Sequence, residues 1–437
     1  MALSVHPLGE IGKFLCTRGD AMKQMIVHCS QHMTRMALLE KGRLVEYAAE
    51  REEQQGLVGS YYKGRVVNVL PGMQAAFVDI GQKKNAFLYV DDVLHPHLEK
   101  QPKVKPSIDT LLKPGQEIIV QVRKEPRGNK GARVTTHYTL PGRWMVYMPF
   151  AEYIGVSKKI GRESERNRLK VLAERLRKNE EGLIMRTVSE DELSEAVEGD
   201  LALLRGQWER IMRRARKAET PALLHRDLSI VQRFIRDTFD PRRDELRIDS
   251  PQAAREAEAF LSEISPEGYR PLELYTGTEP IFAAYGVEEQ LERGFSRKIT
   301  LDGGGTLIWD EAEALTVIDV NTAQYTGGAS LEETVTRTNL VAAEEIGRLI
   351  RLRDTGGIIV IDFIDMDLEE HRKMVVARLE STVSSDRTKT YILGWTRLGL
   401  LEMTRKKVRH DVMEFSTRPC ECCGGTGRTP IWKRGRE

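Results

Sequence analysis

The apolar and polar positions of the chain alternate between short strand-like runs and longer helix-like stripes. Residues 315–318 and 358–361 are mostly branched and apolar, and each run is followed directly by an aspartate, Asp319 and Asp362. Bounded apolar runs of this length are typical of buried strands. Between them, a capping box at residues 330–333 begins an apolar stripe at helical spacing. This stretch is therefore predicted to form a strand, a helix and a strand.

The two aspartates are expected to lie close together. A crossover helix makes its two strands parallel, so Asp319 and Asp362 should emerge at the same edge of one sheet, where open α/β sheets bind ligands. Two neighbouring carboxylates repel each other unless a cation or a shared proton intervenes. Oxygen ligands favour magnesium or manganese. The alternative for either aspartate alone is a cap of a turn or helix, but the pair, each closing a strand of one unit, favours a magnesium site.

Residues 58–136 have a different pattern, in which short strands are separated by Gly and Pro turns, as in a small closed barrel. Aromatic and cationic side chains are mixed in this segment, and single-stranded nucleic acid needs both, for stacking and for phosphate neutralisation. One aromatic alone fits a core position better, but the set resembles the S1 domain of the OB-fold class. The set comprises Tyr62, Phe77, Phe87, Tyr89, Lys63, Arg65, Lys83 and Lys84.

The segments on either side of the barrel are predicted to share one sheet. Strand-like runs in residues 23–47 form a hairpin that needs later sequence to complete its sheet, and residues 229–264 supply alternating helices and a strand. The barrel and the charged helices after it would then be an insertion. One of these helices is predicted to open at Ser189 and to end in the basic run 213–217, which is interpreted as a solvated helix end. Residues 298–309 predict a hairpin at a sheet edge.

Composition narrows the class of protein only slightly. The 437 residues suffice for two to four domains, and 67 Lys plus Arg against 65 Asp plus Glu leave a net charge of +2, so any basic surface must be local. No apolar run is long enough to span a bilayer, and residues 1–21 make a poor signal peptide, so they are interpreted as a flexible extension and the cytoplasm is expected. Five cysteines, three of them within four positions, do not resemble a secreted disulfide framework.

Three motifs identify a family. VIDVNTA at 317–323, NLVAAEEIGRLIRLRDTGGIIVIDFIDM at 339–366 and LGLLEMTRKK at 398–407, with the S1-like barrel before them and a Cys cluster after them, closely resemble the catalytic region of the ribonuclease E/G family of bacterial endoribonucleases. The likeness runs from residue 22 to about residue 428. It implies a metal-dependent cut within single-stranded, A/U-rich RNA that leaves a 5′-phosphate and a 3′-hydroxyl, in rRNA and tRNA processing and mRNA decay.

The resemblance also assigns roles at the active site. Asp319 and Asp362 match the family's two magnesium-ligating aspartates, Asn321 matches a supporting amide, and Arg353 and Asp354 match a charged pair flanking the site. Magnesium at this position would polarise a phosphoryl oxygen and lower the pKa of a bound water. Arg353 is expected to neutralise charge on the phosphate, and Asn321 to orient a water or a ligand.

The resemblance further implies that residues 137–230 sense the 5′-monophosphate of the substrate. Arg186 and Thr187 match the phosphate-gripping pair, one supplying charge and the other a directed hydrogen bond. Lys130, on a short basic loop, matches a further contact with RNA. Lys389 stands where a relative has arginine, and an ammonium cannot make a bidentate contact. For Arg186 the alternative is an ordinary charge at a strand edge.

A zinc site is predicted near the end of the chain. Cys420 and Cys423 form a Cys-x-x-Cys motif followed by glycines, as in a zinc knuckle, with Cys422 as an addition inside it. Structural zinc takes four ligands and the chain has no second pair, so two protomers would each donate two, which resembles the zinc link of the family's homodimers. A redox pair is the alternative. The chain ends at Glu437, before the small domain that helps full-length relatives form tetramers, so a dimer is expected.

The fold class implied by the resemblance is α/β multidomain. An RNase H-like α/β domain is interrupted by an S1 (OB-fold) β-barrel and a 5′-sensor region, and is followed by a DNase I-like α/β catalytic domain and the zinc link. The expected boundaries are 1–21 (extension), 22–57 and 231–295 (RNase H-like), 58–136 (S1), 137–230 (5′ sensor), 296–416 (catalytic), 417–428 (zinc link) and 429–437 (tail).

Two other functions explain fewer of these sequence features. A catalytically silent S1-type RNA-binding protein explains the barrel but leaves the paired aspartates unexplained. A nucleotide-binding α/β protein is disfavoured because no Gly-rich loop of the Walker or dinucleotide type follows a strand.

Overall fold

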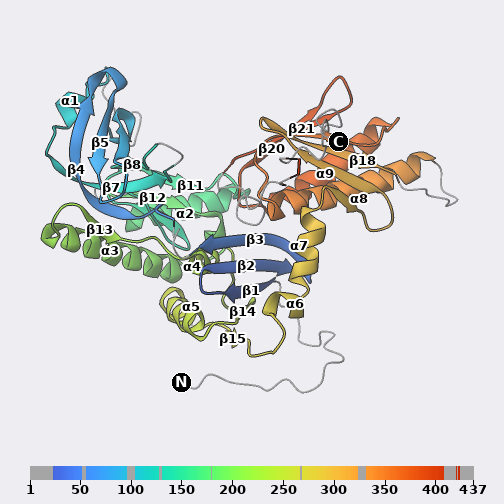
Figure 1. Ribbon diagram of the computed structural model, residues 1–437, viewed down its shortest axis with the longest axis horizontal. Helices are drawn as coiled ribbons and strands as arrows, with labels where there is room; N and C mark the ends of the chain where they lie inside the picture. The colour runs from blue at the N-terminus through green and yellow to red at the C-terminus, as the bar shows by residue number, and fades with distance from the viewer. Residues whose placement is uncertain are drawn as a thin grey trace, which may run out of the picture. The chain divides into compact units, whose positions relative to one another are not determined.

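The computed structural model describes most of the chain, in seven stretches and three cysteines near the C-terminus (Figure 1). The described residues are 23–51, 56–95, 104–126, 130–178, 180–265, 268–322, 331–407, Cys420, Cys422 and Cys423. They divide into two compact units. Unit 1 takes its residues from 1–52, 240–259 and 268–437, and unit 2 from 53–239 and 260–267. No helix in these stretches is long and apolar enough to cross a membrane.

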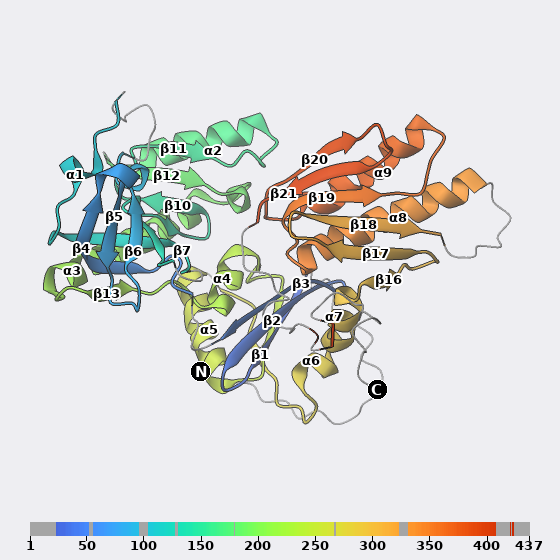
Figure 2. The ribbon, with the colours of Figure 1, turned by 45° about the horizontal axis from the view of Figure 1, so that its top comes forward.

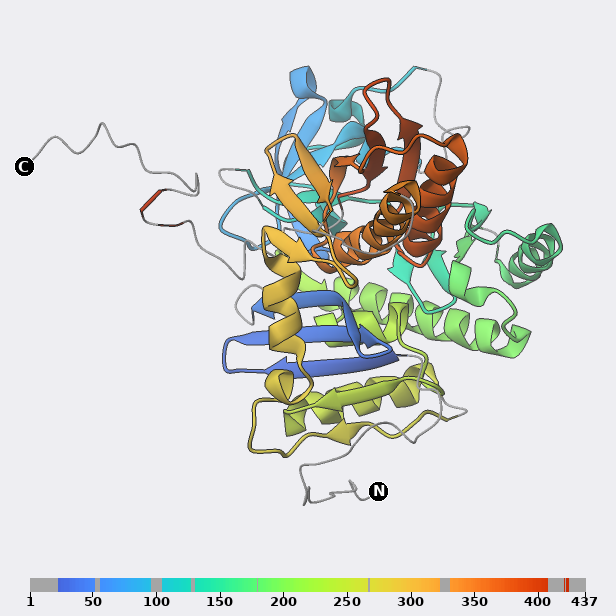
Figure 3. The same cartoon turned by 90° about the vertical axis from the view of Figure 1, so that its right-hand side faces the viewer.

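The first sheet of unit 1 is built from the two chain segments that flank the inserted residues 53–239. Strands β1 (Lys23–Cys29), β2 (Met33–Glu40) and β3 (Arg43–Arg51) are antiparallel neighbours, and β14 (Glu245–Ile248) pairs with β1 in parallel. At the edge, β15 (Glu273–Leu274) continues the sheet (Figure 3). The expectation that later sequence completes the sheet begun at residue 23 is thus confirmed.

The second sheet of unit 1 has the order β16-β17-β18-β19-β21-β20, and only β18 and β19 are parallel (Figure 2). The hairpin predicted at residues 298–309 is confirmed as β16–β17. Ser330, where the predicted capping box begins, lies outside the described residues. The bounds are β16 Lys298–Thr300, β17 Thr306–Glu311, β18 Leu315–Asn321, β19 Gly357–Asp362, β20 Thr390–Trp395 and β21 Leu401–Arg405.

Helix α8 (Leu331–Leu352) connects β18 to β19, as the apolar stripe predicted, and packs against α9 (Glu369–Ser384). Its buried side chains join an apolar core with residues of β17, β18, β19 and β21. Two short helices, α6 (Ile281–Ala284) and α7 (Val287–Phe295), lead into β16. Helix α8 is the crossover between the two aspartate-bearing strands, β18 and β19. Contacts that hold α8 in place therefore also help to hold these strands.

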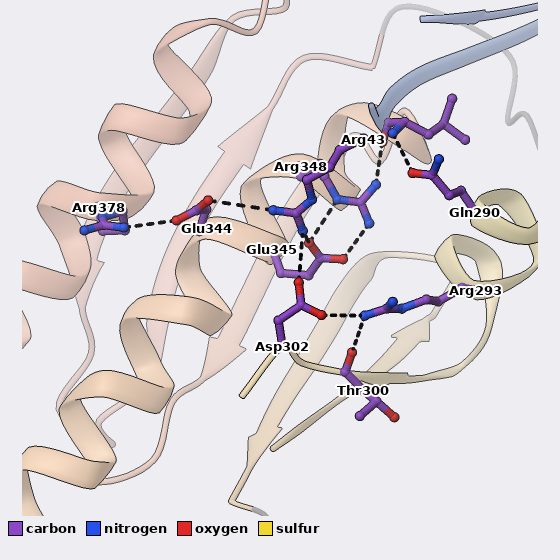
Figure 4. Close-up of polar contacts among 10 residues, drawn as sticks. Arg43, Gln290, Arg293, Thr300, Asp302, Glu344, Glu345, Arg348 and Arg378 are labelled. Carbon is purple, nitrogen blue, oxygen red and sulfur yellow. Dashed lines mark hydrogen bonds and ion pairs between the residues drawn. The ribbon is translucent and has the colours of Figure 1, made fainter. Parts of the chain in front are cut away.

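A polar cluster joins α8 to the first sheet of the same unit (Figure 4). The carboxylate of Glu345, which is buried, accepts hydrogen bonds from Arg43 at 2.7 Å and from Arg348 at 2.9 Å. Arg348 also donates to the carbonyl of Leu44, whose N–H donates to Gln290 of α7 at 2.8 Å. The start of β3 is therefore fastened to both α7 and α8.

Unit 2 contains a five-stranded barrel. Its strands follow the order β4-β5-β6-β8-β7, and β7 closes the barrel by pairing with β4. This closed barrel around a core of apolar residues is consistent with an S1 domain. A strand that the sequence did not predict, β13 (Ala222–His225), adds to the outer edge of β4. The bounds are β4 Tyr61–Leu70, β5 Ala75–Asp79, β6 Ala86–Tyr89, β7 Glu117–Lys124 and β8 Arg133–Thr135, with a short helix α1 at Ile108–Leu111.

The rest of unit 2 is a small sheet with helices. The helix predicted to open at Ser189 begins only at Ser194, so that start was wrong. Ser189 is buried and its hydroxyl donates back to the carbonyl of Arg186 at 2.5 Å, inside a 3-10 turn. The bounds are β9 Leu140–Pro141, β10 Met145–Met148, β11 Ile154–Val156, β12 Gly182–Met185, α2 Glu163–Leu176, α3 Ser194–Lys217 and α4 Ile230–Asp237, and α5 (Pro251–Ile264) follows β14.

Candidate active site

The two predicted aspartates lie directly opposite each other. In the parallel pairing of β18 with β19, Asp319 is the partner of Asp362. Adjacent strands are about 4.8 Å apart, and residues paired in register point to the same face. The two carboxylates therefore share one edge and one face of the sheet, close enough to contact a single cation.

The electrostatics of the pair favour a cation. Partial desolvation, and then the negative charges of Asp319 and Asp365, raise the pKa of Asp362 above its ordinary value. Both neighbouring charges that act on this carboxyl are negative, so the site carries excess negative charge that a divalent ion would relieve. The donors are carboxylate oxygens, the type that magnesium prefers.

The number of protein ligands also suits magnesium. In the described stretches no group of three or more His, Cys, Asp and Glu side chains is arranged to enclose a metal ion. The described residues thus offer an open carboxylate pair rather than a closed cage. Magnesium usually keeps several waters and takes one or two carboxylates, so the residues present fit this ion.

Asn321 lies where the sequence predicted a supporting amide. Strand β18 continues past Asp319 to Asn321, and the Asn321 Nδ2 donates to the Asp319 Oδ2 at 2.6 Å. Two residues along a strand return to the same face. The amide therefore restrains the orientation of the Asp319 carboxylate.

Arg353 and Asp354 are not brought to the aspartate pair. They precede β19, whereas Asp362 ends it, and six strand residues span roughly 16 Å. Arg353 is buried, donates to the carbonyls of Gly294 at 2.8 Å and Ser296 at 2.6 Å, and lies over the Trp309 ring. Burial lowers its pKa to about 10. This position offers support to the core and no direct contact with a phosphate at Asp362.

Asp354 has a comparable structural environment. Its Oδ1 accepts a hydrogen bond from Arg405 Nη1 at 2.7 Å, and Arg405 is shared with the buried carboxylate of Asp386. The φ of Asp354 is +52°, a left-handed conformation at the end of α8 that Asp tolerates better than most residues. Both charged residues expected to flank the site therefore hold the turn between α8 and β19.

A residue that the sequence analysis missed is Asn339. It is fully buried on α8, and its Nδ2 donates to the carbonyl of Ile364 at 2.8 Å while its Oδ1 accepts from the Ile364 N–H at 3.1 Å. This reciprocal pair fixes the backbone two residues after Asp362. The available signal was an Asn inside the apolar stripe of the predicted helix, because a buried amide needs partners.

A second missed contact joins the starts of α8 and α9. The Nδ1 of His371 lies 2.6 Å from the Glu332 Oε1, and the hydrogen bond from His371 lowers the pKa of Glu332. Glu332 also accepts the backbone N–H of Leu368 at 3.4 Å. This contact restrains the segment that leads from Asp362 and Asp365 into α9.

Two of the predicted RNA-binding aromatics form one surface of the barrel. Phe77 and Phe87 are cross-strand partners in β5 and β6, both are half-buried, and their ring centroids are 5.9 Å apart in an edge-to-face arrangement. Lys130 is exposed, and the Phe87 N–H donates to the Ala132 carbonyl at 2.7 Å, which brings the segment after Lys130 alongside β6. Tyr62, by contrast, is buried in the barrel core.

Arg186 and Thr187 adjoin at the end of β12. The Arg186 Nη1 donates to the Gly142 carbonyl at 2.6 Å and to the Asp237 Oδ1 at 2.8 Å, and the Thr187 hydroxyl lies 2.8 Å from that of Ser157. Lys389 belongs to unit 1, where it is exposed and its Nζ lies 4.7 Å from the centroid of the Tyr391 ring.

Asp237 anchors Arg186. Although burial acts to raise it, the hydrogen bond and charge of Arg236, together with Arg186, hold the pKa of Asp237 well below its usual range. Arg236 contacts Asp237 through two nitrogens at 2.9 and 3.0 Å. The carboxylate thus fixes the direction of the Arg186 guanidinium.

Cys420 has an environment that suits a metal-bound thiolate. Hydrogen bonds from the backbone of Cys423 and of Cys422 lower the pKa of the Cys420 thiol. Backbone amides directed at a cysteine sulfur are what a zinc knuckle provides. Most of the surrounding segment, including the glycines after Cys423, lies outside the described residues.

Comparisons with known proteins define the class to which this fold and site belong. A sequence model of the Ribonuclease E/G family matches residues 139–408. Ribonuclease G of Salmonella typhimurium (strain SL1344) and ribonuclease G of Escherichia coli (strain K12) are each 43% identical over 411 residues, which cover 92% of this chain and 84% of theirs. Ribonuclease E of Escherichia coli (strain K12) is 36% identical over 411 residues, 93% of this chain and 39% of that protein. The chain belongs to the ribonuclease E/G family.

Proposed function

We propose that this protein is a cytoplasmic endoribonuclease that cuts within single-stranded, A/U-rich RNA by magnesium-dependent hydrolysis. The products carry 5′-phosphate and 3′-hydroxyl ends, and the activity serves rRNA and tRNA processing and mRNA decay. The observation that carries the proposal is the pairing of Asp319 with Asp362 at one sheet edge, in a chain 43% identical to proteins named ribonuclease G.

The residues of the chain have separate roles in this reaction. Asp319 and Asp362 hold Mg²⁺, which when bound supplies a Lewis acid for a phosphoryl oxygen and a more acidic water. Asn321 orients the Asp319 carboxylate through its 2.6 Å hydrogen bond. Asn339 positions Asp362 by fixing the backbone at Ile364. Arg353 acts as a positioning residue, because its guanidinium holds the carbonyls of Gly294 and Ser296.

The barrel is proposed to bind the RNA substrate. The half-buried rings of Phe77 and Phe87 present faces for base stacking, and Lys130 supplies a cation for phosphate. The alternative function, a catalytically silent S1-type RNA-binding protein, needs only this barrel and gives the aspartate pair no role.

A 5′-monophosphate is proposed to stimulate cleavage through Arg186 and Thr187. Both hydrogen bonds of Arg186 to Gly142 and Asp237 use its Nη1, which leaves the other guanidinium nitrogens available to an anion. The role of Lys389 in sensing the 5′-monophosphate stays a prediction. If Arg186→Gln removes the preference for 5′-monophosphate over 5′-hydroxyl RNA, the assignment holds; a preference that persists contradicts it.

The finer architecture is also a proposal. The interrupted sheet β15-β14-β1-β2-β3 supports an RNase H-like domain in two halves, and the β16–β21 sheet supports a DNase I-like catalytic domain. The amide-supported thiol of Cys420 supports a zinc link, through which two chains would form a homodimer with Cys420 and Cys423 of each as ligands.

The test compares cleavage with binding. A 5′-monophosphorylated, A/U-rich single-stranded RNA is incubated with the purified protein and with an Asp319→Asn, Asp362→Asn double variant, with and without Mg²⁺. Internal cuts by the wild type that need Mg²⁺, absent from the variant while RNA affinity is retained, support the endoribonuclease. Tight RNA binding by the wild type without metal-dependent cuts would favour the silent RNA-binding protein.

A further inference from the structure

Helix α3 ends in basic side chains that the proposed function does not use. Arg210, Arg213, Arg214 and Lys217 are all exposed, and the adjacent Arg213 and Arg214 lie three or four residues from both Arg210 and Lys217. Residues at this spacing lie on one face of a helix. All four line an open groove of roughly 550 Å³, and the basic run is therefore part of a shaped surface and more than a solvated helix end.

The other wall of the groove is β13, the strand that the sequence did not predict. Ala218, Leu223 and Leu224 complete the lining, which includes no acidic residue. Arg214 Nη1 donates to the Leu224 carbonyl at 3.0 Å and holds the helix end against the strand. Figures 1 and 2 both show α3 alongside β13. The basic side chains therefore project from a helix end that is packed against a strand.

In the part of the chain that the structure describes, no carboxylate neutralises the charge of these four basic residues. Some other helical arginines of unit 2 are paired, for example Arg168 with Glu165 and Arg205 with Glu181. Among the described residues the four basic residues form no such ion pair. Their field reaches His225 on β13, whose pKa is lowered by burial and further by the charges of two of the four cations.

The groove is continuous with the barrel. Strand β13 pairs with β4 of the barrel, and Lys63 of β4 donates to the Ala218 carbonyl at the end of α3 at 3.0 Å. The barrel also carries the surface formed by Phe77 and Phe87. A polyanion bound by the groove therefore lies on the same compact unit as the proposed stacking surface for RNA bases.

We propose that this groove, lined by Arg210, Arg213, Arg214 and Lys217, is an additional binding site for the sugar–phosphate backbone of RNA. It is distinct from the aspartate pair and from Arg186 and Thr187. The inference rests on the proposed function, because it presupposes an RNA substrate. The cations extend over about 10 Å of helix, enough to meet more than one phosphate. No aromatic residue lines the groove, so contact with RNA is independent of base sequence.

The test measures the affinity of the full chain for a single-stranded RNA over a series of salt concentrations by fluorescence anisotropy, without Mg²⁺. The variant is Arg213→Gln, Lys217→Gln, which leaves the Arg214 contact with β13 intact. The matched control is Arg166→Gln, Lys170→Gln, which removes two exposed cations from α2 of the same unit. A second control, Arg213→Lys, Lys217→Arg, keeps the charge.

The groove variant is expected to bind RNA more weakly, with a slope of log affinity against log salt that is shallower by about 1.4, since each lost phosphate contact contributes about 0.7 for a single strand. The loss should be equal for 5′-hydroxyl and 5′-monophosphate RNA, and both controls should bind like the wild type. An unchanged slope, an equal loss in the α2 control, or a loss only with 5′-monophosphate RNA would each overturn the inference.

Failure of this inference and failure of the proposed function are distinguishable. A wild type that cuts RNA with Mg²⁺, but whose affinity does not respond to the groove variant, refutes only the groove. A wild type that binds no RNA refutes both. Groove variants that lose binding to anionic phospholipid vesicles, while their RNA affinity is unchanged, would show a lipid-binding surface and overturn the inference.

Discussion

At the scale of single residues, the candidate site depends on side chains that follow a strand immediately. Asp319 and Asp362 were predictable because an apolar run defines the strand, and a crossover helix makes the two strands parallel. The environment of Arg353 was not predictable in this way. Its partners, the carbonyls of Gly294 and Ser296 and the ring of Trp309, come from segments that meet only in the folded chain.

Asn339 provides a test at this scale. Asn339→Leu removes both hydrogen bonds to Ile364, so the segment after Asp362 is no longer held and the carboxylate loses its alignment. We expect kcat to fall by roughly 10² while the Kd for RNA stays unchanged, because a small misplacement of a catalytic group costs about that much. Steady-state kinetics and a binding assay measure the two quantities.

The matched control for Asn339 is Thr338→Val on the same helix, which removes a hydroxyl that bonds only within α8, to the Thr334 carbonyl. Its kcat should remain near that of the wild type. If both variants lose activity alike, or if Asn339→Leu weakens RNA binding instead of kcat, the positioning role is contradicted.

Among the secondary-structure elements, the sequence predicted most strands and helices but missed the strand β13 and the start of α3. Hydrophobic periodicity identified α8 and both hairpin regions because burial on one face sets the period. It missed β13, which is four residues long and depends on the edge of β4 for its hydrogen bonds. It also placed the start of α3 at Ser189, since a serine hydroxyl that bonds backwards is indistinguishable from a helix cap in sequence.

The contact between β12 and α4 gives a pH-dependent prediction. The pKa of Asp237 is lower in the folded chain than in the unfolded chain, so its ion pairs stabilise unit 2 fully above about pH 4, the ordinary carboxyl range, and lose that effect as the pH falls below it. Asp237→Asn should therefore lower the free energy of unfolding near neutral pH by about 3 kcal/mol, and by progressively less as the pH falls below 4 toward the lowered pKa of Asp237.

Thermal unfolding of the wild type and Asp237→Asn, followed between pH 2.5 and pH 7, measures this difference. Asp240→Asn serves as a comparison, because that residue caps a turn after α4 and does not contact Arg186 or Arg236. If the free energies of unfolding of the wild type and Asp237→Asn differ by the same amount from pH 2.5 to pH 7, the stabilising role of the Asp237 ion pairs is contradicted.

In the whole molecule, one compact unit is inserted into the sequence of the other. Residues 53–239 stand in the sequence between β3 and β14, which belong to one sheet. The sequence predicted this insertion because the first three strands needed partners that only later sequence supplied. The family resemblance was also predictable, and its finer implications of a zinc-linked dimer and a 5′ sensor stay predictions.

The zinc link is tested by substitution of its proposed ligands. Cys420→Ser, Cys423→Ser should convert the dimer to a monomer and abolish a zinc content of one ion for every two chains, because a structural site needs four ligands. Light scattering after gel filtration and metal analysis measure both quantities. Cys422→Ser is the control and should keep dimer and zinc. A dimer that survives zinc removal would refute the shared site.

The shared magnesium site is tested by the initial rate of RNA cleavage as a function of Mg²⁺ concentration, for the wild type, Asp319→Asn and Asp362→Asn. If the two opposed carboxylates hold the ion together, each single variant should need far more Mg²⁺ and lose at least about 10²-fold in maximal rate, while Asp365→Asn keeps most of its activity. Variants that cut RNA at the wild-type rate and with the wild-type Mg²⁺ dependence would contradict a magnesium site made by Asp319 and Asp362.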